Sequence, residues 1–342
     1  MQRKRRIYVF ALAMLLAAVL AVLAWFFLPA GDPIFHGKRE SEWLTNIVYG
    51  ESKARIQQWR DFGPEGLRVL ERGLEPGRGY RYRQFYRRYA YKLPRSIVRL
   101  LPSPATDKSY STRMCVISLL SDMDTNAWPA WRAAARALED EQDGVRQSAI
   151  SFFTRREDDS ALLNRMPPRD KKSLLPRFLR GLEDPSNWGL RNNAAIALRY
   201  YPEERQVVAP ALAKALADAQ PQVRLIAAES LNRIDPIAAS RAGVVNVLAA
   251  IVVHPDDQIA GRAPSVLRHC RNDADEAVAA LLKGLHSTNS LVSSSSVWAL
   301  EAFPSHADSI LPELRKAAER TDHAGGYAKQ AVKKLEARQA AQ

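Results

Sequence analysis

Apolar residues recur in the C-terminal half of the chain with a period of about two helices. Five leucines mark the period at spacings of 33, 36, 33 and 35 residues: Leu198, Leu231, Leu267, Leu300 and Leu335. A second apolar or aromatic residue lies eight positions before each leucine: Leu190, Val223, Ile259, Val292 and Tyr327. A helix pair cannot bury its apolar face alone, so this recurrence predicts an α-solenoid of stacked helix pairs.

The segment 207–231 shows the anatomy of one predicted pair. Val208 and Leu212 lie at helical spacing in a first helix, the run from Asp218 to Pro221 breaks it, and Val223 opens a second helix. Five more segments have the same form: 128–153, 173–198, 242–270, 275–303 and 309–337. The first pair begins at Gly63-Pro64 and resumes at 112–123 after a long insertion. The pattern therefore predicts about seven helix pairs.

An uncharged stretch of 22 residues, Ile7 to Leu28, precedes the repeats and follows four basic residues at 3–6. A membrane-spanning helix needs about 20 apolar residues, and flanking basic residues favour the cytoplasmic side. We therefore expect a single-pass membrane protein with a cytoplasmic N-terminus and a periplasmic or extracytoplasmic solenoid. A cleaved signal peptide is the alternative, but its apolar core is usually about 7–15 residues and ends in small residues.

These patterns divide the chain into five parts. We expect a basic cytoplasmic tail, a transmembrane helix, a juxtamembrane linker with a lead-in helix, the solenoid and a C-terminal tail. Their boundaries are 1–6, 7–28, 29–60, 61–337 and 338–342.

Three predicted turns are followed by an apolar residue, an arginine and, three positions later, an alanine: Val145-Arg146 with Ala149, Leu190-Arg191 with Ala194, and Val223-Arg224 with Ala227. Together with proline in first helices, this resembles the HEAT-repeat family, including its short-repeat bacterial branch. The segment 34–44 also resembles the opening of membrane-anchored bacterial HEAT-repeat proteins. The resemblance implies an all-α, right-handed solenoid and a protein-binding scaffold, and it names no partner.

The net charge of +13 is concentrated in one window, because residues 53–100 contribute +9 and residues 101–342 only +2. Within this window, basic and aromatic residues alternate. Arginine can pair with an anion in a fork and aromatic rings can stack. The candidate contacts to an anion or partner are Arg81, Arg83, Arg87, Arg88, Lys92 and Arg95. The structural alternative, compatible with the first, is a helix that packs its aromatic stripe inward while the arginine stems reach water: Tyr82, Phe85, Tyr86 and Tyr89.

Because the predicted topology places this basic region outside the cytoplasm, we expect no nucleic-acid partner. The expected partners are another envelope protein and, near the membrane, anionic lipid headgroups. The sequence contains no HExxH, CxxC, GxSxG or GxxxxGK[ST] motif, and its six histidines are scattered. We therefore predict no catalytic, cofactor-binding or metal-binding residues.

The predicted function is a membrane-anchored, non-enzymatic HEAT-repeat scaffold that binds another protein through its solenoid surface. The alternative is a HEAT-like lyase-type enzyme, or a subunit of one, that acts on a bound ligand. An enzyme of that kind needs a ligand-sized pocket with a convergent acid or nucleophile.

Overall fold

The computed structural model describes residues 32–76, 78–99, 101, 109–155 and 161–340, together with Met14. The chain forms two compact units, Met1–Phe152 and Phe153–Gln342. Regular structure in the described residues is helical except for one two-stranded hairpin. This agrees with the prediction of a helical-repeat fold.

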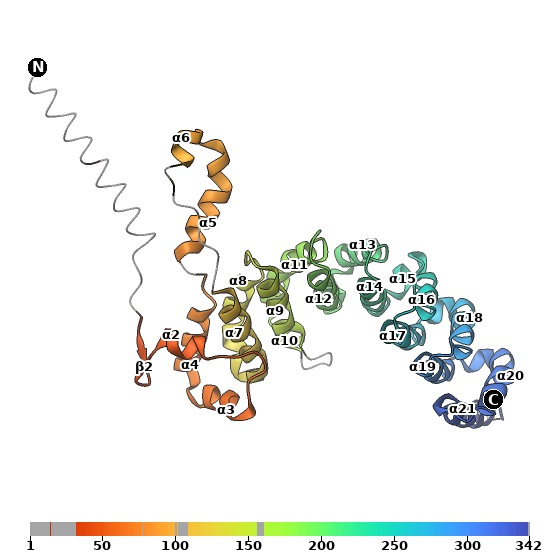
Figure 1. Cartoon of the computed structure of the whole chain (residues 1–342). Helices are drawn as coiled ribbons and strands as arrows, with labels where there is room; N and C mark the ends of the chain where they lie inside the picture. Colours follow the sequence, from red (N-terminus) through yellow and green to blue (C-terminus); the bar gives the residue numbers. More distant parts are fainter. Residues whose placement is uncertain are drawn as a thin grey trace, which may run out of the picture. The chain divides into compact units, whose positions relative to one another are not determined.

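The second unit is a series of antiparallel helix pairs (Figure 1). The pairs are α11 (Pro168–Leu182) with α12 (Trp188–Leu198), α13 (Arg205–Ala215) with α14 (Pro221–Ile234), α16 (Val244–Val252) with α17 (Asp257–Leu267), α18 (Ala274–Leu285) with α19 (Ser290–Leu300), and α20 (Ala307–Ala318) with α21 (His323–Ala340). Shorter helices are α10 (Leu162–Arg165), α15 (Pro236–Arg241), η3 (Pro202–Glu204), η4 (Arg271–Asp273) and η5 (Pro304–His306). The second helices of successive pairs contact one another, so they line one side of the unit.

The leucine period marks the core of this unit, as predicted. All five leucines from Leu198 to Leu335 have an exposed fraction of 0%. Four of the five earlier markers are also buried, but Tyr327 is 51% exposed and does not belong to the core. Helix α21 packs instead through small residues, including Ala324 and Ala328, which lie beside Tyr327 on the helix.

The first unit contains the predicted first pair, interrupted by an insertion. Its helices are α4 (Gly63–Gly73) and α7 (Tyr110–Met123), and the insertion holds α5 (Arg78–Tyr89), η1 (Ala90–Lys92) and α6 (Arg95–Val98). Pro64 lies in the first turn of α4, where its missing N–H has no helical partner to lose. The following elements are η2 (Asp124–Ala130), α8 (Trp131–Ala137) and α9 (Asp143–Thr154).

The segment expected to hold a linker and a lead-in helix contains a hairpin and two helices. Strands β1 (Ile34–Phe35) and β2 (Lys38–Arg39) form a hairpin, and α2 (Glu40–Thr45) and α3 (Lys53–Asp61) follow. The hairpin turn contains Gly37 at φ +77°, a conformation that glycine adopts without strain. Trp43 Nε1 donates to Phe35 O at 2.8 Å, and both side chains are buried in an aromatic cluster with Trp59. The hairpin and Trp43 therefore stabilise the start of the first unit.

The prediction of a membrane-spanning helix is corrected by the structure. No helix in the described part of the chain is long and apolar enough to cross a membrane. The longest of these helices, α21, has 18 residues and carries Lys329, Lys333 and Lys334 on its exposed sides. The predicted span, residues 7–28, lies outside the described residues apart from Met14. The structure therefore does not support the expected anchor or the extracytoplasmic placement that followed from it.

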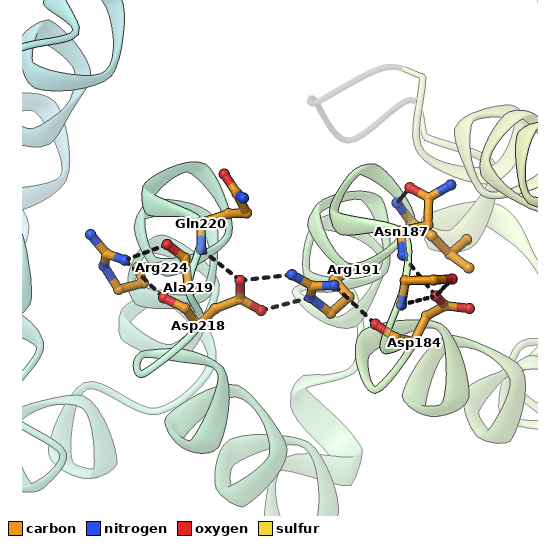
Figure 2. Close-up of polar contacts among 9 residues, drawn as sticks. Asp184, Asn187, Arg191, Asp218, Ala219, Gln220 and Arg224 are labelled. Carbon is orange, nitrogen blue, oxygen red and sulfur yellow. Dashed lines mark hydrogen bonds and ion pairs between the residues drawn. The ribbon is translucent and has the colours of Figure 1, made fainter.

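An arginine–aspartate contact joins two successive pairs in the second unit (Figure 2). Arg191 on α12 forks onto the turn aspartate of the next pair, with Nε to Asp218 Oδ2 at 2.7 Å and Nη2 to Oδ1 at 2.9 Å. Its Nη1 donates to the carbonyl of its own turn, Asp184 O, at 3.0 Å. Arg224 makes the equivalent contact with its own turn, because its Nη1 donates to Asp218 O at 2.8 Å. Each arginine thus holds its own turn, and Arg191 also fixes the neighbouring one.

Truncation of a period leucine should be strongly destabilising. Leu231→Ala removes a fully buried side chain from α14, so we expect a loss of about 2–5 kcal/mol in the free energy of unfolding, measured in urea. The matched control is Arg233→Ala, an exposed position on the same helix that should change stability by less than about 0.5 kcal/mol. Glu229 is unsuitable as a neutral control because it pairs with the buried Arg199 at 3.2 Å. Equal losses for the leucine and arginine variants would contradict the repeat register.

The Arg191–Asp218 pair should contribute stability that depends on pH. Burial alone would raise the pKa of Asp218, but hydrogen bonds from Arg191 and from the Gln220 N–H hold it below the ordinary value of 3.8. A carboxyl whose pKa is lower in the folded state stabilises that state above its unfolded pKa and loses the effect as pH falls through the folded value. Asp218→Asn, which retains an acceptor for Gln220, should therefore cost about 1–3 kcal/mol at pH near 7.

The deficit of Asp218→Asn relative to wild type should shrink when unfolding is measured below the pKa of the folded carboxyl. A double-mutant cycle with Arg191→Met isolates the pair. Additive effects of the two substitutions at neutral pH would show that the contact contributes nothing.

Candidate partner-binding surface

The surface predicted from the basic residues rests on the turn between α8 and α9. Arg113 on α7 forks onto Asp140 in this turn, with Nη2 to Oδ1 at 3.0 Å and Nε to Oδ2 at 2.9 Å. Both side chains are buried, at 1% and 3% exposed. Asp140 Oδ1 also accepts the N–H of Gln142, and Arg146 Nη1 donates to Asp140 O. The turn is therefore held by the same contacts as the turn at Asp218.

The next residue in this turn, Glu141, attaches the inserted helix α5. Its side chain is 1% exposed and lies 2.6 Å from Arg83 Nε through Oε1. Arg87, one turn further along α5, places Nη1 3.4 Å from Glu141 Oε2. A buried carboxylate needs such cations, because an unpaired charge away from water is costly. Two of the six predicted contact residues thus have a structural role in holding α5.

Of the four other predicted residues, three lie further along the insertion and are exposed: Arg88, Lys92 and Arg95. Arg88 Cζ and Lys92 Nζ lie 5.8 Å and 5.9 Å from the centre of the Tyr89 ring. No ion pair joins these three cations to any described residue. Arg81 belongs to α5, but its side chain is outside the described set. The exposed charges are therefore free to meet an external anion, and Tyr89 helps to orient two of them.

The aromatic stripe of this insertion is only partly packed inward. Tyr82 is buried, and burial raises the pKa of its hydroxyl. The ring centres of Phe85 and Tyr89 lie 5.4 Å apart, and the two residues are 40% and 42% exposed. Each interpretation of the sequence therefore holds for a different end of α5. The α5 end near Tyr82 is anchored, and the end near Tyr89 presents rings and cations together.

Sequence reasoning identified the basic residues but missed Glu141. This residue is separated from Arg83 by 58 positions, so no local spacing links the two. The available signal was weak: Glu141 is one acidic residue in a turn that also contains Asp140 and Asp143.

A cavity of about 420 Å³ lies elsewhere in the first unit, between α4 and η2. Its polar lining residues are Arg60, Arg68, Glu71 and Asn126, and its apolar lining includes Leu67. The lining contains one acid but no serine, cysteine or histidine. It therefore offers one acid, Glu71, but no serine or cysteine nucleophile, for the alternative lyase-type function.

Arg83 and Arg88 should respond differently to neutralisation. Arg83→Gln leaves Glu141 buried with only the more distant Arg87, so we expect a loss of about 1–3 kcal/mol in the free energy of unfolding and faster amide exchange in α5. Arg88→Gln changes an exposed cation and should alter stability by less than about 0.5 kcal/mol. Unfolding in urea and hydrogen exchange measure the two effects. Identical exchange in α5 for both variants would contradict the anchoring role of Glu141.

Comparison with known proteins gives information on the fold alone. No family model and no curated protein matches the chain. The crystal structure of an engineered protein is similar at a TM-score of 0.51 and 18% identity, covering 86% of this chain and 78% of that one. An archaeal HEAT-like repeats protein from Thermococcus onnurineus NA1 is also among the neighbours, with 16% identity over 69% of this chain and 99% of that one. Its TM-score of 0.42 is too low to support an argument by itself.

Proposed function

We propose that this chain is a non-enzymatic, HEAT-like repeat scaffold that binds an acidic protein partner through the exposed end of its inserted helix. The observation that carries the proposal is the charge of residues 78–95, which include seven basic residues and no acidic one. Within this segment, Arg83 and Arg87 share one carboxylate, Glu141, which offsets one of their two charges. The exposed cations Arg88, Lys92 and Arg95 remain to bind an external anion.

A protein carboxylate suits this surface better than a nucleic acid. Duplex binding usually uses an extended basic face with many phosphate contacts. Residues 101–342 carry a net charge of only +2, so the positive charge is local. A local cluster of cations and rings matches a short acidic segment of a protein.

The repeats supply the rigidity that such a surface needs. Glu141 lies directly after Asp140, and Asp140 is fixed by the buried Arg113. Holding α5 to this turn reduces the freedom that would otherwise be lost on binding. The buried Arg113–Asp140 contact therefore supports the scaffold proposal alongside the charge of the insertion.

Neutralising the exposed cations should weaken binding to an acidic chain. The variant Arg88→Gln/Lys92→Gln/Arg95→Gln of the full chain should bind fluorescent polyglutamate about tenfold more weakly, because each exposed pair contributes roughly 0.5 kcal/mol. Wild-type binding should fall steeply with salt, since exposed charges are screened over about 8 Å at physiological ionic strength. Fluorescence anisotropy measures both effects.

The matched control removes the same charge from another surface. Arg205, Arg233 and Lys283 are exposed cations of the second unit without ion pairs to described residues. Their triple glutamine variant should bind polyglutamate within about twofold of wild type, a difference of roughly 0.4 kcal/mol. If both triple variants lost the same affinity for polyglutamate, the effect would come from net charge and not from this surface. Tighter binding to duplex DNA than to polyglutamate at the same salt concentration would favour a nucleic-acid partner and overturn the proposal.

A further inference from the structure

A second surface, on helix α19 of the second unit, goes beyond the proposed function. Helix α19 has no charged residue, yet Leu291 is 50% exposed and Trp298 is 47% exposed. These residues are seven positions apart, so they lie on the same side of the helix after about two turns. Between them, Ser294 and Ser295 are half-buried and small. The exposed side of α19 is therefore an uncharged strip with a large apolar residue at each end.

Contacts with the preceding second helix hold both large residues in place. Leu291 lies over Gly261 of α17, where an added Cβ would come within 2.6 Å of the leucine Cδ2. The Trp298 ring is 3.8 Å from Arg268 Cζ, and Arg268 Nη1 donates to Trp298 O at 2.9 Å. An exposed tryptophan fixed by its neighbours is typical of residues that dominate binding at interfaces, because little side-chain freedom is lost there.

The spacing of Leu291 and Trp298 fits the width of a helix. Seven residues at about 1.5 Å rise separate them by roughly 10 Å along the axis, which is about the diameter of a helix with its side chains. Ser294 and Ser295 leave room there for aliphatic side chains of a helix that crosses α19. A helix that lies between Leu291 and Trp298 can therefore pack its apolar face on the serines.

The charge beside this strip is positive. Arg268 lies next to Trp298, and Arg262 on α17 is an exposed arginine whose Nη2 is 3.7 Å from Glu229. A crossing helix would place its flank over α17, where carboxylates would meet Arg262 and Arg268. We infer that α17 and α19 form a docking surface for an amphipathic helix with aliphatic residues on one face and acidic residues beside them.

The test uses the full chain with Arg88→Gln/Lys92→Gln/Arg95→Gln, so that the inserted helix does not contribute. The probe is a fluorescent amphipathic peptide helix of leucine, alanine and glutamate, and its comparison has lysine in place of glutamate. We expect the glutamate peptide to bind and the lysine peptide to bind at least about tenfold more weakly, a difference of roughly 1.4 kcal/mol. Absence of binding by the glutamate peptide overturns the inference.

Two substitutions and one control localise the peptide. Trp298→Ser should weaken binding about tenfold, and Gly261→Ala should weaken it by displacing Leu291 without removing apolar area. Trp188→Ser is the matched control, because Trp188 opens another second helix and is also 47% exposed. It should leave binding within about twofold of the parent. Equal losses at Trp188 and Trp298 overturn the assignment to α19.

A second copy of the chain is the competing occupant of this surface. Sedimentation equilibrium of the wild-type chain and of Trp298→Ser tests it. A monomer in both cases supports a separate helical partner. A dimer that Trp298→Ser dissociates overturns the inference in favour of self-association. Because the three exposed cations of the proposed polyglutamate surface are already removed in the peptide experiment, failure there leaves the proposed polyglutamate binding unaffected.

Discussion

The contact between an arginine and the turn aspartate of the next pair fixes the register of this structure. Arg191 binds both oxygens of Asp218, and Asp218 also accepts the N–H of Gln220. The aspartate therefore closes its own turn and binds the preceding pair with one carboxylate. Apolar packing supplies most of the attraction between pairs, but it is not directional. The forked pair adds direction, and so favours one orientation of α12 relative to the turn at Asp218 (Figure 2).

The part of the fold that sequence predicts well depends on local periodicity. Leu198 and Leu231 recur because each second helix must bury the same side against its neighbours, and both are fully buried. Tyr327 breaks the rule because α21 packs through Ala324 and Ala328, which are less conspicuous in a hydrophobic pattern. A pattern of large apolar residues therefore predicts the presence of a helix pair more reliably than it predicts which side chains of the pair are buried.

The candidate surfaces could be predicted only in part, because they depend on contacts between distant residues. The composition of the insertion predicted an anion-binding role, but it could not separate Arg83, which holds Glu141, from Arg88, which is exposed. Likewise, the arginine after each turn was visible as a motif, whereas its bond to an aspartate 27 residues ahead was not. Trp298 gave no signal at all, since a tryptophan at helical spacing is usually buried.

The two proposed surfaces use a cation against an aromatic ring in different ways. Near Tyr89, the cations Arg88 and Lys92 are exposed and the ring orients them, so long-range attraction should dominate and salt should weaken it. At α19, Arg268 is bonded to the carbonyl of Trp298 and holds the ring for an apolar contact, which salt screens little. Attraction to the first surface would therefore depend mainly on charge, and retention on the second surface mainly on apolar contact. Because charge steering acts on the association rate and buried anchors act on dissociation, the salt dependence of the two rates would separate the contributions of the surfaces.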